Sequence, residues 1–264
     1  FPDTYEKQII AAITNKWLST KCFTYFNFIL SLAKQDFIVD LSQLSENEKK
    51  MLIMLHYDVC QNAGGFTSLA SSILEIGRNK VLATEIIEVL EFLVDNLDFK
   101  EIEANLPYEQ PLKLHARYTR DQILAAFGLS TFERKSPSRE GIAENTVLNT
   151  ELLFINLIKS EENFSPSTMY DDYAINESLF HWQSQNSAGP DTPKGIYYIE
   201  HVKNKKVILL FVREKNKDEF GSTMGYVFIG EGKLIEHNGA KPMNIKWQLN
   251  EPLPHYLWKD AAKL

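Results

Sequence analysis

The hydrophobic pattern of this chain changes its period once, and that change constrains the fold more than any other feature. In the first hundred residues apolar side chains recur every three to four positions, as in VLATEIIEVLEFLVDNL (81–97), which predicts amphipathic helices. From about residue 151 the apolar segments are short, rich in β-branched and aromatic residues, and separated by turn residues, which predicts strands. The segment NLPYEQP (105–111) lies between the two regions. We therefore predict an α+β fold, with a helical domain over 1–105 and a β-rich domain over 112–264.

Local signals refine both halves. Ser45 and Glu48 form the sequence pattern of a capping box before a helix, and Thr119 with Gln122 repeats that pattern before a short helix that stops at Gly128. The predicted strands share a content of β-branched and aromatic residues. They are 151–158, 195–202, 206–213, 225–230, 232–237 and 245–249. We expect them to form a mostly antiparallel curved sheet or barrel.

Composition excludes several classes of protein. The chain has 264 residues and a net charge of -7, and its longest apolar runs, MLIML (51–55) and VILLFV (207–212), are far shorter than the roughly 20 residues that cross a bilayer. No glycine-rich phosphate loop, histidine pair with metal-ligand spacing or serine nucleophile elbow is present. We therefore expect no catalytic residue, no metal and no bound ATP in this chain, and no membrane partner. Because the sequence starts with Phe1 and has no leader, we expect it to be part of a longer protein.

One short stretch suggests a ligand. Residues 170–186 combine four aromatic rings, two adjacent carboxylates and four carboxamides, a density of polar groups that a core has little use for. Such a set can stack on a nucleobase, accept its exocyclic amine and read its remaining edge, as pockets for flipped bases do. Packing against the sheet remains the alternative for each ring taken singly. The candidate pocket residues are Tyr170, Asp171, Asp172, Tyr173, Trp182, Gln183 and Gln185.

Two other functions stay open. The tyrosine and tryptophan cluster can instead be the hot spot of a protein-interaction module that docks a larger protein onto a partner. A Mg²⁺-dependent nuclease is a third hypothesis, because Asp191, the strand 207–212 and Glu214 resemble a metal-binding layout. The lysines stand one and three residues after Glu214, which on a strand would aim them at the opposite face from its carboxylate.

Several segments, in order, resemble one family. They are SPSTMYDDYAINESLFHWQSQN (165–186), GIYYIEH (195–201), ILLFVRE (208–214), YVFIGEGKLIEHNGAKPMNIKWQL (226–249), PLPHYL (252–257), LHARYTRDQILAAFG (114–128) and REGI (139–142). Together they look like the C-terminal region of type IV restriction endonucleases that fuse a phospholipase-D-type nuclease to a superfamily 2 helicase, the SauUSI-like enzymes. These enzymes attack DNA that contains 5-methylcytosine or 5-hydroxymethylcytosine.

The resemblance implies a division of labour. The helical part is similar to the coupler between helicase and reader, and the β part is similar to an SRA-like target recognition domain, which flips the modified cytosine into an aromatic pocket. Tyr170 or Tyr173 with Trp182 would supply the rings, and Asp171 or Asp172 the acceptor. The resemblance further implies double-stranded DNA with modified cytosine as partner, helicase and nuclease domains in the same polypeptide that hold ATP and Mg²⁺, a role in phage defence, and the bacterial cytoplasm.

Contacts with the DNA backbone need cations. Residues 1–105 carry fifteen acids and nine bases, so we look for these cations in the remainder of the chain. The candidates are Lys203, Lys205, Lys206, Arg213, Lys215 and Lys217, with Arg117, Arg120 and Arg139 as a second group.

Overall fold

A computed structural model of the chain describes residues 4–60, 62, 64–157, 172–219 and 221–261. The chain divides into two compact units, Phe1–Ser138 and Arg139–Leu264. The segment 105–111, where the sequence predicts a domain boundary, therefore lies inside the first unit. We describe the two units separately.

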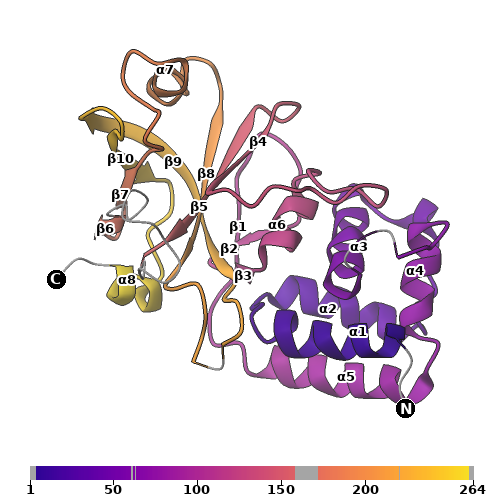
Figure 1. The fold of residues 1–264 in the computed structure, drawn as a ribbon. Coiled ribbons are helices and arrows are strands. Elements are labelled where there is room, and N and C mark those ends of the chain that lie inside the picture. Colours follow the sequence, from indigo (N-terminus) through magenta and orange to yellow (C-terminus); the bar gives the residue numbers. More distant parts are fainter. Residues whose placement is uncertain (1–3, 61, 63, 158–171, 220, 262–264) are drawn as a thin grey trace. The chain divides into compact units, whose positions relative to one another are not determined.

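The first unit is helical (Figure 1). Its helices are α1 (Thr4–Ala12), continued by the π-helical turn η1 (Ile13–Trp17), α2 (Phe23–Ala33), the short 3₁₀ helix η2 (Leu41–Gln43), α3 (Glu46–Val59), α4 (Leu69–Ile76), α5 (Lys80–Asp95) and α6 (Arg120–Ala126). Its strands are β1 (Ile102–Glu103), which pairs with β2 (Lys113–Leu114), and β3 (Arg117–Tyr118). The helical period of the first hundred residues is thus confirmed.

The predicted helix caps are confirmed at atomic detail. The Ser45 hydroxyl accepts the backbone N–H of Glu48, whose carboxylate accepts the backbone N–H of Ser45 in return. Thr119 and Gln122 make the same reciprocal pair at the start of α6. Such boxes satisfy donors that the first turn of a helix leaves without partners.

A buried carboxylate ties four helical segments of this unit together. The Oδ2 atom of Asp58, on α3, accepts hydrogen bonds from Trp17 Nε1 at 3.0 Å, Tyr25 Oη at 2.8 Å and Gln122 Nε2 at 2.9 Å. Burial raises the pKa of Asp58, while the charge of Lys16 opposes that shift. Because the three donors come from η1, α2 and α6, Asp58 fixes these elements against α3.

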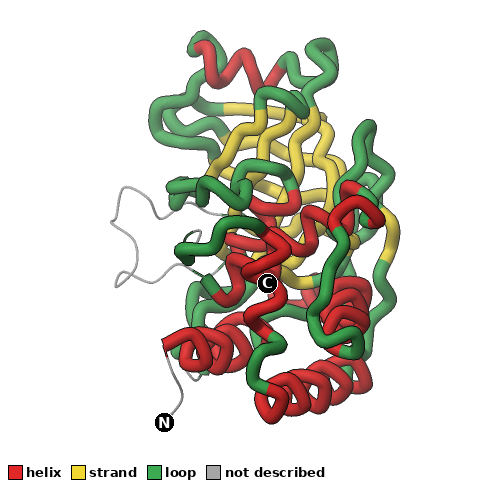
Figure 2. The backbone as a smooth tube through the Cα atoms, turned by 90° about the vertical axis from the view of Figure 1, so that its right-hand side faces the viewer, coloured by secondary structure: helices red, strands yellow, loops and turns green. Residues whose placement is uncertain are grey.

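The second unit is built on one twisted sheet, whose strands lie side by side in Figure 2. The strand order is β4-β5-β8-β9-β10-β7-β6. The strands are β4 (Ile142–Asn145), β5 (Thr150–Asn156), β6 (Tyr173–Asn176), β7 (Leu179–Gln183), β8 (Val207–Arg213), β9 (Tyr226–Asn238) and β10 (Asn244–Leu249). All neighbours are antiparallel except β5 and β8, which are parallel.

One face of this sheet carries the core of the second unit, and we call it the core face. Alternate residues of the strands, among them Leu210, Ile245 and Trp247, form one buried cluster with Tyr198 and Leu257. Tyr198 belongs to α7 (Pro193–Ile199) and Leu257 to α8 (His255–Ala261), so both helices cover the core face. Burial of these large side chains, at roughly 25 cal/mol per Å² of apolar area, holds the helices on the sheet.

The structure corrects three details of the predicted sheet. The segment 195–202 is not a strand, because Thr192 caps and Pro193 begins helix α7 there. The predicted strands 225–230 and 232–237 form the single strand β9, which bends where Gly230 has a φ of 96°. The described strands form an open sheet with edges at β4 and β6, so the curved sheet is confirmed and the barrel is wrong.

Candidate functional site

Strand β7 carries the second half of the aromatic stretch and divides it between two faces. Phe180 and Trp182 belong to the buried cluster of the core face. Successive side chains of a strand point to opposite sides, so His181 and Gln183 lie on the other face. This second face carries the polar side chains of β6, β7, β10 and the end of β9.

Two rings stack on this second face. Tyr173 of β6 lies directly opposite His181 of β7, and residues paired in this way share a face. Their ring centroids are 4.7 Å apart and their planes are inclined by 20°. Tyr173 is half-buried, whereas His181 is buried. The pair therefore forms a stack of two aromatic rings at the edge strand of the sheet.

Carboxamides form a row beside the stacked rings. Gln183 pairs with Asn244 of β10, and Asn244 pairs with Asn238 of β9. Gln183 Nε2 donates to Asn244 Oδ1 at 2.9 Å, and Asn244 Nδ2 donates to Asn238 Oδ1 at 3.2 Å. These three side chains and the rings of Tyr173 and His181 form what we call the polar platform.

Charged groups border the polar platform on two sides. Lys246 lies opposite His181 and makes a 2.7 Å ion pair with Glu236. Asp172, directly before β6, is buried, and its Oδ1 atom accepts the backbone N–H of Gln183 at 2.9 Å. A backbone donor thus holds the carboxylate of Asp172 beside β7.

The sheet separates residues of the predicted pocket. Tyr170 and Asp171 lie outside the described residues. Trp182 is 5% exposed and packs edge-on against Tyr198 at 5.3 Å, on the core face. The predicted pairing of Tyr173 with Trp182 around one base is therefore wrong, because the sheet lies between them.

The two glutamines of the predicted pocket also separate. Gln183 belongs to the polar platform. Gln185 follows β7, and its Oε1 atom accepts the hydroxyl of Tyr198 at 3.1 Å, beside the core face. The sequence reasoning missed His181 and Asn244. The period of two along β7 was the available signal, because it places His181 with Gln183 and apart from Trp182.

A second polar group lies between β5 and α7. Glu151 is fully buried and receives hydrogen bonds from Lys194 Nζ and Tyr198 Oη, both at 2.8 Å. Burial raises the pKa of Glu151, and the charge of Lys194 opposes the shift. Both partners belong to α7, so this group anchors the helix to the sheet.

The nine predicted phosphate contacts differ in exposure. The exposed ones are Lys203, Lys205, Lys215, Lys217 and Arg139. Lys206 is 6% exposed and makes a 2.6 Å ion pair with Glu144, so its charge already has a counter-charge within the unit. Arg117 and Arg213 are buried as well. Arg120 is half-buried and donates from Nε to the carbonyl of Ser138 at 3.1 Å.

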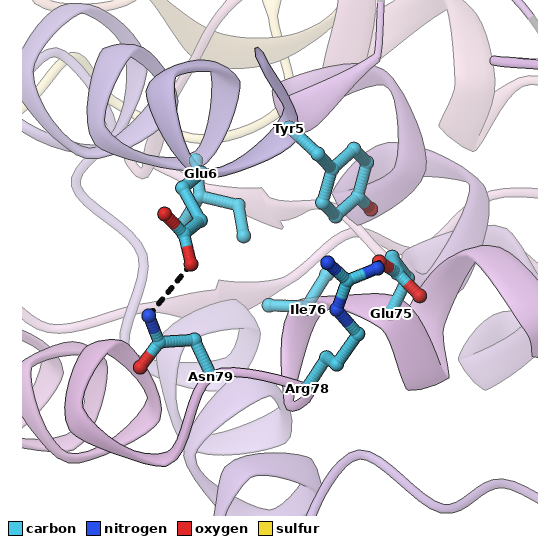
Figure 3. A pocket seen from close by; sticks show the side chains of 7 residues that line it. Tyr5, Glu6, Glu75, Ile76, Arg78 and Asn79 are labelled. Atoms are coloured by element: carbon cyan, nitrogen blue, oxygen red, sulfur yellow. Dashed lines mark hydrogen bonds and ion pairs between the residues drawn. The ribbon is translucent and has the colours of Figure 1, made fainter. Parts of the chain in front are cut away.

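A small recess lies in the helical unit, where α1 faces the turn between α4 and α5 (Figure 3). It encloses ≈ 10 Å³, about the space that one water molecule needs. Its polar groups already have partners, since Asn79 donates to Glu6 at 2.6 Å and Arg78 pairs with Glu75. The recess therefore offers no ligand site.

The described part of the chain has neither a metal-binding cluster nor a membrane-spanning helix. Within it, no three histidine, cysteine, aspartate or glutamate side chains converge on a point where a metal ion fits. No helix there combines the length and the apolar character needed to span a bilayer.

Comparison with known proteins shows a family match and a slight likeness to a solved structure. No curated protein matches the sequence. The crystal structure of Arabidopsis thaliana SUVH6 in complex with SAM is similar with a TM-score of 0.36 and 10% identity, over 97% of this chain and 41% of that chain. This chain thus spans about two fifths of that one, and so slight a likeness carries no weight. The family described as "Domain of unknown function (DUF3427)" matches residues 112–261, which is more than half of the chain. The chain therefore belongs to the DUF3427 family.

Proposed function

We propose that this chain is the DNA recognition module of a modification-dependent restriction endonuclease. The second unit would bind double-stranded DNA and take up a flipped 5-methylcytosine or 5-hydroxymethylcytosine at the polar platform. The resemblance of several segments to type IV restriction enzymes suggests this role, and the chemistry of the polar platform supports it.

The observation that carries the proposal is the Tyr173–His181 stack beside the carboxylate of Asp172. A base stacks on an aromatic face, and a carboxylate accepts the exocyclic amine of cytosine. Carboxamides such as that of Gln183 can pair with the remaining polar edge, because each offers both a donor and an acceptor. The polar platform and the adjoining Asp172 together contain all three kinds of group.

The energies predict modest selectivity. Stacking contributes about 1 to 3 kcal/mol per base, and extruding a base from the duplex costs a few kcal/mol. The two terms nearly cancel. Discrimination then depends on the methyl group, whose contact with an apolar pocket is worth about 1 to 3 kcal/mol. We expect a preference of about tenfold to 200-fold, roughly the range that those energies span.

The proposal assigns recognition to this chain and cleavage to other domains of the same polypeptide. The nuclease and helicase domains of that polypeptide would use Mg²⁺ and ATP, and this chain would need no cofactor. It would act in the bacterial cytoplasm against phage DNA. The helical unit would couple the reader to the helicase.

The test is a binding titration of the full chain with duplexes that carry 5-methylcytosine, 5-hydroxymethylcytosine or plain cytosine at one position, with and without Mg²⁺. We expect tighter binding of the modified duplexes and no cleavage. Tyr173→Ala and Asp172→Asn should each reduce the preference for modified DNA at least several-fold, because each removes one contact with the base.

Val202→Ala provides the matched control, since Val202 is 62% exposed and lies in the turn after α7, outside the polar platform. The control should bind like the wild type. Retention of the full preference by both Tyr173→Ala and Asp172→Asn would reject the polar platform as the pocket. Mg²⁺-dependent cutting would favour the nuclease hypothesis instead.

A protein-interaction module remains the second candidate function, but its contact surface would lie on α5 rather than at Trp182. Trp182 is buried and cannot be the hot spot that the sequence suggested. On α5, however, Val81 is 74% exposed and Phe92 is 64% exposed, and an exposed phenylalanine is typical of contact surfaces. Absence of any DNA binding in the titration would favour this candidate.

A further inference from the structure

Arg213 is a buried cation at the C-terminal end of β8. Its exposed fraction is 8%. The guanidinium donates from Nε to Asn156 Oδ1 and from Nη1 to the carbonyl of Met224 at 3.0 Å, and it lies over the ring of Tyr226 at 4.3 Å from the centroid. All of these partners are neutral.

No carboxylate among the described residues lies within ion-pair distance of Arg213. Two other buried charges of the same unit do have a counter-charge. Lys206, at 6% exposed, has Glu144 at 2.6 Å, and the fully buried Glu151 has Lys194 at 2.8 Å. Arginine is rarely buried without such a counter-charge, because removing a cation from water costs free energy that an opposite charge must offset.

The guanidinium keeps a group available for a ligand. Its Nη2 amino group makes no hydrogen bond to a described residue, and it is not sealed from solvent. Burial lowers the pKa of Arg213, and the neighbouring Tyr226 opposes that shift. An anion that reaches Nη2 would supply the missing counter-charge and a strong, charge-assisted hydrogen bond.

Two further cations follow within four residues. Lys215 and Lys217 are exposed and make no ion pair with a described acid, unlike Lys203, which pairs with Glu200 at 2.9 Å. A short antiparallel bridge between Lys217 and Thr223 holds this segment as a hairpin next to Tyr226. Several cations at one strand end suit a ligand with more than one anionic oxygen.

We infer that Arg213, Lys215 and Lys217 form a binding site for a phosphate group at the C-terminal end of β8. The guanidinium fork and its neutral neighbours orient one phosphate, and the two lysines add charge around it. The use of this site for a backbone phosphate of DNA rests on the proposed function, whereas its affinity for a phosphate group does not.

Inorganic phosphate is the first probe. We expect it to raise the melting temperature of the full chain in a saturable way at constant ionic strength, because a ligand that binds only the folded state stabilises it. Arg213→Gln should abolish the rise, and Arg213→Lys should keep part of it. Lys233→Gln, which removes an exposed lysine of β9, should leave the rise unchanged.

An equal rise in wild type and Arg213→Gln, or no rise in either, would overturn the site. Because Arg213→Gln can alter folding, the double variant Lys215→Gln/Lys217→Gln is measured as well. Both lysines are exposed, so this variant should fold normally and need more phosphate to reach the same melting temperature.

Duplex DNA is the second probe and separates this site from the base pocket. Arg213→Gln should weaken binding of methylated and plain duplexes by the same factor, about tenfold, and lower the salt slope by about 1. The preference for methylated DNA should stay as in the wild type. If Arg213→Gln abolishes the rise in melting temperature with inorganic phosphate but leaves the salt slope of DNA binding unchanged, the DNA backbone is rejected as the ligand of this site. Loss of the methyl preference in Tyr173→Ala alone tests the proposed function independently.

Discussion

The ring of Tyr173 stacks on the imidazole of His181, while Trp182, the next residue in the chain, packs on the opposite face of the sheet. The chain therefore separates two aromatic groups that its sequence places side by side. The stacked pair belongs to the polar platform, and the tryptophan belongs to the core. Substitutions at the two positions should have different consequences.

Substitution of His181 should affect recognition. In His181→Ala the Tyr173 ring loses its stacking partner, so we expect the affinity for methylated duplex to fall by about 1 kcal/mol or more. His181→Phe keeps a flat ring and should restore most of the affinity. Fluorescence anisotropy with methylated and plain duplexes measures both. Equal affinities for His181→Ala and the wild type would show that the stack does not support the base.

Substitution of Trp182 should affect stability. Trp182→Ala leaves a cavity between Tyr198 and Trp247, and we expect it to lower the free energy of unfolding by about 3 to 5 kcal/mol. Trp182→Phe should cost less and should keep the preference for methylated DNA. Urea denaturation followed by circular dichroism measures the loss. A stable Trp182→Ala variant that has lost only its DNA preference would contradict the assignment of Trp182 to the core.

Glu151 should make stability depend on pH. Burial raises its pKa in the folded state above the ordinary value of 4.5, so folding favours the protonated form. Its contribution to stability is then fully present below pH 4.5 and is lost as the pH rises through the raised pKa. Glu151→Gln has no carboxyl group at this position and does not lose stability in this way. The melting temperature of the variant minus that of the wild type should therefore increase with pH. Glu177→Gln, at an exposed position, serves as the control. Parallel pH profiles for wild type and Glu151→Gln would contradict the prediction.

Asp58 should be essential to the helical unit. Asp58→Ala leaves the donors of Trp17, Tyr25 and Gln122 without their acceptor, and we expect a loss of about 3 kcal/mol or more in the free energy of unfolding. Gln122→Ala removes one of these donors and a capping partner, so it should cost less, about 1 to 2 kcal/mol. Glu85→Ala, exposed on α5, should be near neutral. Thermal denaturation compares the three variants. A larger loss in Gln122→Ala than in Asp58→Ala would reject the central role of the carboxylate.

Local signals in the sequence predicted much of the fold because their effects act within a few residues. The helical period and the capping boxes at Ser45 and Thr119 gave the helices and their starts. The prediction of a strand at 195–202 was wrong because the aromatic and β-branched residues of this segment favour a strand when only the local sequence is considered. The segment forms a helix instead because Thr192 caps its start and Tyr198 packs onto the core face.

What the sequence determined by itself was the division into helical and β-rich parts, the helix starts at Ser45 and Thr119, and the presence of polar and aromatic groups between 172 and 186. What only the tertiary structure decided was which of those groups meet. A strand turns alternate side chains to opposite faces, so the partners of His181, Trp182 and Gln183 depend on the register with β6 and β10. The register depends on contacts between segments up to about 70 residues apart in the chain, and no local sequence pattern encodes those contacts. The same holds for Arg213, whose lack of a counter-charge appears only when its spatial neighbours are known.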